Sequence, residues 1–150
     1  TEIDTAQNAI FATRRPSASD DPTPWLLHLA RVQDSVATAF SYETDRMRFI
    51  GRGRSAIDPA ALRGGAALSG SAGPVLDAVA AIRVAFTLEP GASCTIDWIT
   101  GIAASRDDCA ALARKCLTAP DARGILDGAG TYRQATLQRL QVGDADALLY

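Results

Sequence analysis

Residues 42–62 read YETDRMRFIGRGRSAIDPAAL and place three signals in one short segment: the end of a strand, an arginine-rich turn and a short helical turn. The residues that lead into this segment alternate between two faces, as a half-buried β-strand does. One face carries Val36, Thr38, Phe40 and Tyr42, and the other carries Ala37, Ala39, Ser41 and Glu43. The alternation therefore predicts a strand that ends where the arginines begin.

Arginine is dense after this strand, at positions 46, 48, 52, 54 and 63. Gly51 and Gly53 bracket Arg52, and glycine allows a positive φ that exposes backbone N–H groups. Asp58 followed by Pro59 is typical of an N-cap and a first helical position, which predicts a helical turn over residues 59–63. A β-turn whose arginines pair with nearby carboxylates, from Glu43, Asp45 or Asp58, explains the segment without any ligand.

The same glycines match a loose dinucleotide-binding pattern, Gly51 to Ala56. That pattern requires a turn directly from a strand into a long helix within a βαβ unit, whereas Asp58-Pro59 interrupts the segment here. The sequence therefore favours a plain glycine-rich turn.

Hydrophobic periodicity predicts the remaining elements. Strands are expected over residues 9–13 and 25–32, and a β-hairpin is expected over residues 79–102, with its turn at residues 89–92. Helices are expected over residues 106–116, with Ser105 and Asp108 as a near capping box, and over residues 121–140. The glycine- and serine-rich residues 64–74 are expected to form a loop.

The 150 residues suit one soluble domain, with 47% hydrophobic and 21% charged residues. A net charge of -2 disfavours nucleic-acid binding, and no apolar run approaches the ~20 residues of a membrane helix, so no direct membrane contact is expected. Three cysteines without short paired spacing indicate neither a disulfide framework nor a zinc site. The chain begins without methionine, which favours a fragment of a longer protein.

The ordered combination of YETDR, IGRGR, DPAAL, LSG from Leu68 and VLD from Val75 resembles the amino-terminal β-sandwich domain of glycoside hydrolase family ninety-four. Within that family the run is most similar to the cyclic β-1,2-glucan synthases. The resemblance covers roughly residues 1–117. It departs from the family pattern at Ala78, where members usually carry proline, and at the glycines of residues 124–130.

This resemblance implies a mainly β fold, an antiparallel β-supersandwich (galactose-mutarotase-like) fragment with a C-terminal helical linker. Residues 1–104 would form the sandwich, and residues 105–150 would lead to a catalytic (α/α) barrel that these residues do not contain. The parent enzyme would be a glycosyltransferase or an inverting glucan phosphorylase at the inner membrane, with this region cytoplasmic. The chain itself would be non-catalytic, supporting the barrel and contacting β-1,2-glucan.

The candidate carbohydrate- or phosphate-contact residues are Arg52, Arg54, Tyr42 and Trp98. No catalytic residue, metal site or cofactor is predicted. His28 lacks nearby partners for a triad or metal site and is expected to be structural. Asp144 and Asp146 are interpreted as helix-capping residues rather than a metal-binding pair. An assembly domain that forms a homodimer through exposed strand edges, without binding sugar, is the alternative function.

Overall fold

The computed structural model describes residues 1–18, 21–33, 38–119 and 122–143. The chain divides into two compact units, Thr1–Thr118 and Ala119–Tyr150. The first unit contains two antiparallel sheets, sheet A with the order β1-β2-β3-β6 and sheet B with the order β4-β5. Two of the strands, β3 (Trp25–Val32) and β2 (Ala9–Thr13), have the bounds that the sequence predicts. The mainly β fold class with a C-terminal helix is confirmed.

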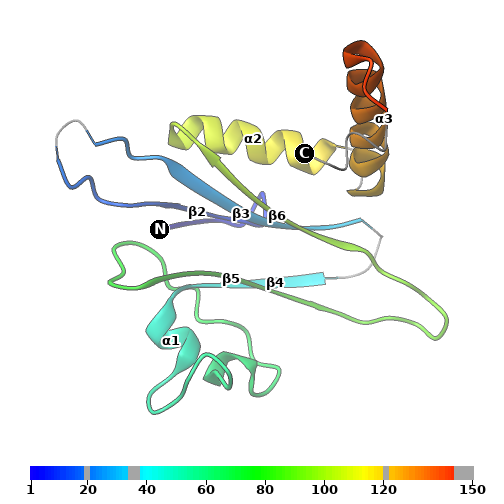
Figure 1. Ribbon diagram of the computed structural model, residues 1–150. Coiled ribbons are helices and arrows are strands. Elements are labelled where there is room, and N and C mark those ends of the chain that lie inside the picture. The colour runs from blue at the N-terminus through cyan, green and yellow to red at the C-terminus, as the bar shows by residue number, and fades with distance from the viewer. Residues whose placement is uncertain (19–20, 34–37, 120–121, 144–150) are drawn as a thin grey trace. The chain divides into compact units, whose positions relative to one another are not determined.

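Sheet A also contains β1 (Glu2–Asp4) and β6 (Ile96–Ala103), and one of its faces forms the core of the molecule. The side chains of Ala9, Phe11, Leu27 and Leu29 are fully buried on this face. They pack beneath α2 (Arg106–Thr118), which Figure 1 shows lying along the sheet. The sequence did not predict β1, whose three residues are held by pairing with β2.

Helix α2 follows the predicted pattern closely. Ser105 Oγ accepts from the Asp108 backbone N–H at 3.1 Å, which confirms Ser105 as the N-cap, and it donates to the Asp108 carboxylate at 2.6 Å. Cys109 and Ala113 are buried against sheet A, with Leu112 and Cys116 partly buried beside them. The apolar stripe expected from the sequence is therefore the surface that covers the sheet.

The predicted hairpin over residues 79–102 is wrong in its pairing, although both strands exist. Strand β5 (Ala78–Phe86) pairs with β4 (Thr38–Asp45) in sheet B, whereas β6 pairs along its whole length with β3 in sheet A. The turn at its tip is present, since Ala92 N–H donates to Glu89 O at 3.0 Å. Alternation indicates which residues share a face of a strand, but it does not specify the neighbouring strand. Residues 87–95 span the two sheets instead of closing a hairpin.

Sheet B lies against the face of sheet A opposite α2, so the first unit has three layers (Figure 1). Ile10 and Ala30 are fully buried on this second face. Two polar contacts join sheet B to the segments before and after β1 of sheet A. The Tyr42 hydroxyl donates to Asn8 Oδ1 at 3.0 Å, and the hydroxyls of Thr1 and Thr44 lie 2.6 Å apart.

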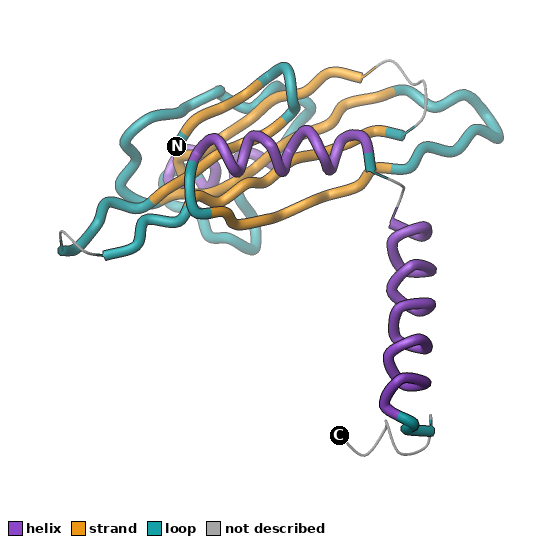
Figure 2. Tube along the Cα trace, turned by 90° about the horizontal axis from the view of Figure 1, so that it is seen from above, coloured by secondary structure: helices purple, strands orange, loops and turns teal. Residues whose placement is uncertain are grey.

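Helix α3 (Ala122–Leu140) belongs to the second unit. It forms as predicted despite its glycines, and Figure 2 shows its regular turns. Within the described part of the chain, no helix is long and apolar enough to cross a membrane. Asp144 and Asp146 lie outside the described residues, so their predicted capping role stays a prediction.

Candidate functional site

The arginine-rich segment begins with a helix that the sequence analysis did not predict. α1 (Arg46–Ile50) starts at Asp45, whose carboxylate accepts from the backbone N–H groups of Met47 at 2.9 Å and Arg48 at 3.4 Å. It ends at Gly51, whose N–H donates to Met47 O at 2.8 Å. An aspartate directly before a run with apolar residues at Met47 and Ile50, three apart, is an N-cap signal, so this helix could have been found in the sequence.

Residues 51–58, named here the arginine turn, follow α1 on the side of sheet B away from sheet A (Figure 1). Gly51 and Gly53 adopt φ values of +84° and +70°, as their position around Arg52 predicts. A polar hollow of about 550 Å³ is lined by Arg52, Gly53, Arg54, Ser55 and Asp58. The turn thus brings together the two arginines that the sequence singled out.

The two arginines differ in their surroundings. Arg54 donates to the Asp58 carboxylate at 3.0 Å, and Arg63 donates to the same carboxylate through two nitrogens. The hydrogen bond from Arg63, aided by the charge of Arg54, holds the pKa of Asp58 below its usual range. Arg52 is exposed, and no ion pair or hydrogen bond of its side chain is recorded among the described residues. Its guanidinium is therefore available for an oxygen-rich ligand.

Asp58 is not the N-cap that the sequence predicts. The helical turn that follows is a 3-10 turn, η1 (Ala60–Leu62), which receives no side-chain cap. The Asp58 carboxylate is engaged by Arg54 and Arg63 instead, because two guanidinium groups compete successfully with a backbone N–H. Asp58 therefore fastens the arginine turn to the start of the following loop.

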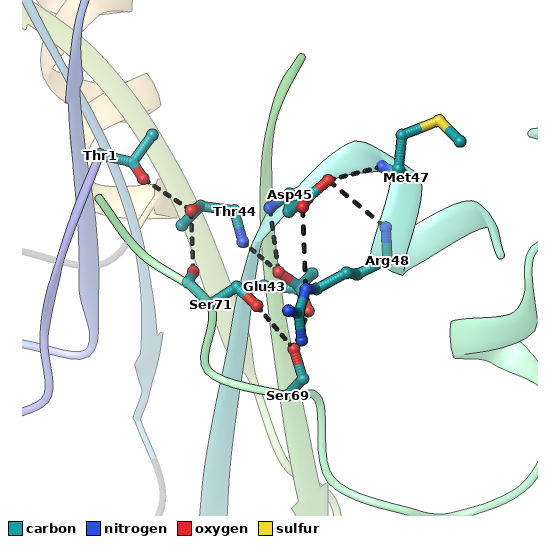
Figure 3. Close-up of polar contacts among 8 residues, drawn as sticks. All are labelled: Thr1, Glu43, Thr44, Asp45, Met47, Arg48, Ser69 and Ser71. Carbon is teal, nitrogen blue, oxygen red and sulfur yellow. Dashed lines mark hydrogen bonds and ion pairs between the residues drawn. The ribbon is translucent and has the colours of Figure 1, made fainter. Parts of the chain in front are cut away.

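Glu43 is a buried carboxylate that holds the base of this region, and its side chain is only 2% exposed. Its Oε1 accepts from the backbone N–H groups of Thr44 at 3.0 Å and Asp45 at 2.9 Å, while Oε2 accepts from the Ser69 hydroxyl (Figure 3). Thr44 in turn donates to Ser71 O at 2.8 Å. The loop of residues 64–74 is thus fixed to the end of β4, although it contains no helix or strand. The sequence analysis allowed Glu43 to form an ion pair with an arginine of the turn. In the structure its carboxylate binds these backbone and hydroxyl donors instead.

A second hollow, of about 340 Å³, lies beside this carboxylate. Most of its lining is apolar. It is lined by Glu43, Arg48, Phe49, Ala60, Ala61, Arg63, Ala66, Ala67, Leu68 and Ser69. Arg48, one of these lining residues, has a side chain that is 64% exposed, and its Nε lies 3.8 Å from the Asp45 carboxylate.

Tyr42 is not brought to the arginine turn. Tyr42 is 6% exposed between the two sheets, and burial together with the charge of Asp4 raises the pKa of its hydroxyl. In this position Tyr42 contributes to packing and to the hydrogen bond with Asn8.

Trp98 lies on β6, in the other sheet from the strand that precedes the arginine turn. It is 51% exposed and stacks on the His28 ring, with centroids 6.0 Å apart and planes inclined by 14°. His28 Nδ1 lies 2.9 Å from the Thr100 hydroxyl, and burial lowers the pKa of the imidazole. These contacts are those of a structural histidine, as the sequence predicts, and of the four candidate residues only Arg52 and Arg54 share a site.

In the described residues, no group of three or more His, Cys, Asp or Glu side chains is arranged to hold a metal ion. The remaining carboxylates near the turn, Asp45 and Asp58, are engaged as a helix cap and in ion pairs. The described part of this region therefore offers hydrogen-bond donors for binding an oxygen-rich ligand, and its acids serve the structure.

Comparison with known sequences agrees with this architecture. The glycosyl hydrolase 94 supersandwich domain matches residues 1–119, so the chain belongs to this family. Over 107 residues it is 31% identical to the cyclic beta-(1,2)-glucan synthase NdvB of Rhizobium meliloti (strain 1021). The match spans 71% of this chain and 4% of that relative. The family resemblance seen in the sequence is thereby confirmed.

Proposed function

We propose that this chain is the non-catalytic sandwich part of a larger enzyme that makes or cleaves β-1,2-glucan, and that its arginine turn contacts the glucan. Membership of the supersandwich family and the similarity to a cyclic β-1,2-glucan synthase support the proposal that the parent enzyme acts on β-1,2-glucan. The observation that carries the contact is Arg52, an exposed guanidinium without a side-chain partner among the described residues. It lies on a turn that the ion pairs of Asp58 with Arg54 and Arg63 stabilise.

The chemistry of the turn suits a sugar chain. A guanidinium presents several N–H donors in a fixed plane, which matches the closely spaced hydroxyl oxygens of a glucan. Arg54, which is held in place by Asp58, adds donors without the entropy cost of ordering a free side chain. Trp98 stands on the other sheet, so any stacking of a sugar ring on its face would be a separate contact.

In this proposal catalysis takes place in a helical barrel further along the parent chain. Inverting cleavage of a glycosidic bond needs a carboxylic acid placed opposite the attacking water or phosphate. The described acids near the arginine turn are committed to structural contacts. The sandwich would support the barrel, with the parent at the inner membrane and this domain on the cytoplasmic side.

Two assays test this function. The purified chain, mixed with β-1,2-glucan and inorganic phosphate, is expected to consume no phosphate and to release no sugar phosphate. Phosphate consumption that tracks the purified chain would overturn the non-catalytic role.

The glucan contact is tested by calorimetric titration of β-1,2-glucan into the chain and its variants. Arg52→Ala, alone and with Arg54→Ala, is expected to weaken binding about tenfold or more. Arg114→Ala removes an exposed arginine from α2 and serves as the matched control. If Arg52→Ala and Arg114→Ala bind β-1,2-glucan with equal affinity, the arginine turn does not contact the glucan.

The second candidate function is an assembly domain that binds no sugar. One observation favours it: β6 lies at an edge of sheet A and has exposed apolar side chains, so it could pair with a second copy whether or not the chain binds glucan.

A further inference from the structure

Strand β6 (Ile96–Ala103) forms an edge of sheet A, because no strand among the described residues pairs with its outer side. It is the last strand in the order β1-β2-β3-β6, and the opposite edge is formed by the three residues of β1. In sheet B, the edge of β4 is occupied by a loop, since Gly70 N–H donates to Tyr42 O at 2.8 Å. Strand β5 carries Arg83 near its centre, whose guanidinium donates to the backbone oxygens of Ala61 and Ala66 and so holds this segment against sheet B.

The register of β6 shows which backbone groups face outward. Gln33 N–H donates to Thr95 O at 3.0 Å, and the β3–β6 register continues from this pair without a shift. Residues of antiparallel strands alternate between hydrogen-bonded and non-hydrogen-bonded pairs, so Asp97, Ile99 and Gly101 bond toward β3. The backbone groups at the even positions then point away from the sheet. These positions are Ile96, Trp98, Thr100 and Ile102.

Strand β6 lacks the devices that protect an edge. It contains no proline, no lysine and no bulge. Its one charge, Asp97, is engaged within the sheet, because Arg31 Nη2 donates to it at 2.6 Å and Gln33 Nε2 also at 2.6 Å. Two of the four residues whose backbone groups point outward also have exposed apolar side chains, Trp98 by 51% and Ile102 by 67%.

The sequence of this strand is self-complementary under a two-fold axis. Residues 96–102 read IDWITGI, with isoleucine at both ends and in the centre. An axis through Ile99 places Ile96 opposite Ile102 of the other copy. It also places Trp98 opposite Thr100 and Asp97 opposite Gly101, so no like charges meet. In this register the even positions form the hydrogen-bonded pairs, which are the positions whose backbone groups point outward.

We propose that β6 pairs antiparallel with β6 of a second copy of this chain, about a two-fold axis through Ile99, joining two copies of sheet A into one continuous sheet. Helix α2 contacts β2, β3 and β6, so it covers a face of sheet A rather than this edge. The proposal does not rest on the glucan contact, and it names the surface that a homodimer of this chain would use.

The test combines the mass of the 150-residue chain in solution with the exchange rates of its amide protons. Sedimentation from about 10 μM to about 1 mM is expected to show a dimer forming with concentration. Over the same range, the amide protons of residues 96, 98, 100 and 102 become slower to exchange, while those of residues 99 and 101 are protected throughout. A chain that remains monomeric at the highest concentration overturns the proposal. So does a dimer in which these four protons are unaffected.

Charge substitutions test the register. Ile102→Lys, at an exposed position, is expected to raise the dimer dissociation constant about tenfold. Adding Ile96→Glu to the same chain restores dimerisation to within about threefold, because the carboxylate introduced at position 96 then faces the ammonium group introduced at position 102 of the other copy. Ile57→Lys, at a position 96% exposed in the arginine turn, is the matched control and leaves the dimer unchanged. Failure of the second substitution to restore the dimer, in a double variant whose circular dichroism matches that of the parent, contradicts this register.

Discussion

Gly51 and Ala60 are in close contact across the arginine turn: a methyl group added to Gly51 would lie 2.6 Å from the Ala60 Cβ. Gly51 also has φ +84° and ψ +156°, a backbone conformation that is essentially restricted to glycine. Contact and conformation together fix the direction in which the chain leaves α1. The position of Arg52, the residue directly after it, therefore depends on a glycine.

Substituting the two glycines that flank Arg52 separates these effects. Gly51→Ala is expected to lower the free energy of unfolding by about 2–4 kcal/mol, because it adds both strain and a clash. Gly53→Ala has a similar positive φ but open space around it, so a loss of about 1–2 kcal/mol is expected. Urea unfolding of both variants measures the difference. Equal losses would show that the contact with Ala60 contributes nothing.

Glu43 is expected to be the most sensitive polar residue of this region. Glu43→Ala leaves two backbone N–H groups and the Ser69 hydroxyl without their acceptor, and should cost about 2–4 kcal/mol of stability. Ser69→Ala removes only one of these donors and should cost about 1 kcal/mol. Urea unfolding at neutral pH compares the two variants. A smaller loss for Glu43→Ala than for Ser69→Ala would be contrary to this account.

The Arg31 and Asp97 pair joins the two longest strands of sheet A to α2. Arg31 donates to Asp97 and also to Cys116 O at 3.0 Å, near the C-terminus of the helix. Asp97→Asn is expected to lower the free energy of unfolding by about 1–3 kcal/mol. Hydrogen bonds from Gln33 and Arg31 lower the pKa of Asp97 from 3.8.

The sign of the pH dependence follows from this lowered pKa. The contribution of Asp97 is fully present above pH 3.8 and is lost as the pH falls below that value, because the unfolded chain then binds the proton first. Urea unfolding from about pH 5 to about pH 2.5 should therefore show a smaller fall in stability for Asp97→Asn than for the parent chain, at about the pH values where aspartate titrates. Parallel curves would contradict this assignment.

His28 provides a second pH-dependent contribution, and it is the one histidine of the chain. Burial lowers the pKa of His28 from 6.5, so folding is favoured above pH 6.5 and is weakened as the pH falls through the lowered value. The parent chain is expected to lose stability from about pH 7 to about pH 5 relative to His28→Gln. Thermal unfolding across this range measures the difference. A parent chain that gains stability relative to the variant on acidification would reverse the predicted sign.

Most elements of the fold could be predicted from the sequence, because periodicity reports which residues share a face. Strand β3 and helix α2 follow directly from their apolar patterns. The pairing of β6 could not be predicted, because the alternation of Ile96–Ala103 fits a hairpin with β5 as well as pairing with the more distant β3. Register with β3 depends on contacts between distant residues, such as Arg31 with Asp97, that local patterns do not encode.

The candidate site was predictable only in part. Gly51 and Gly53 around Arg52 predict positive φ values, and both residues adopt them. The burial of Glu43 and Tyr42 arises from segments distant in sequence, namely Ser69 in the loop and Asn8 in the opposite sheet. An alternating strand cannot reveal that both of its faces become covered at one end.

The most direct test of the central claim is a nuclear magnetic resonance titration of the isotope-labelled chain with linear and cyclic β-1,2-glucans. The account predicts saturable amide shifts that cluster at residues 51–55, in the arginine turn, with Arg114→Ala behaving as the parent chain and Arg52→Ala losing the shifts. An absence of shifts at millimolar glucan, in a chain whose spectrum shows it to be folded, would contradict the proposed contact.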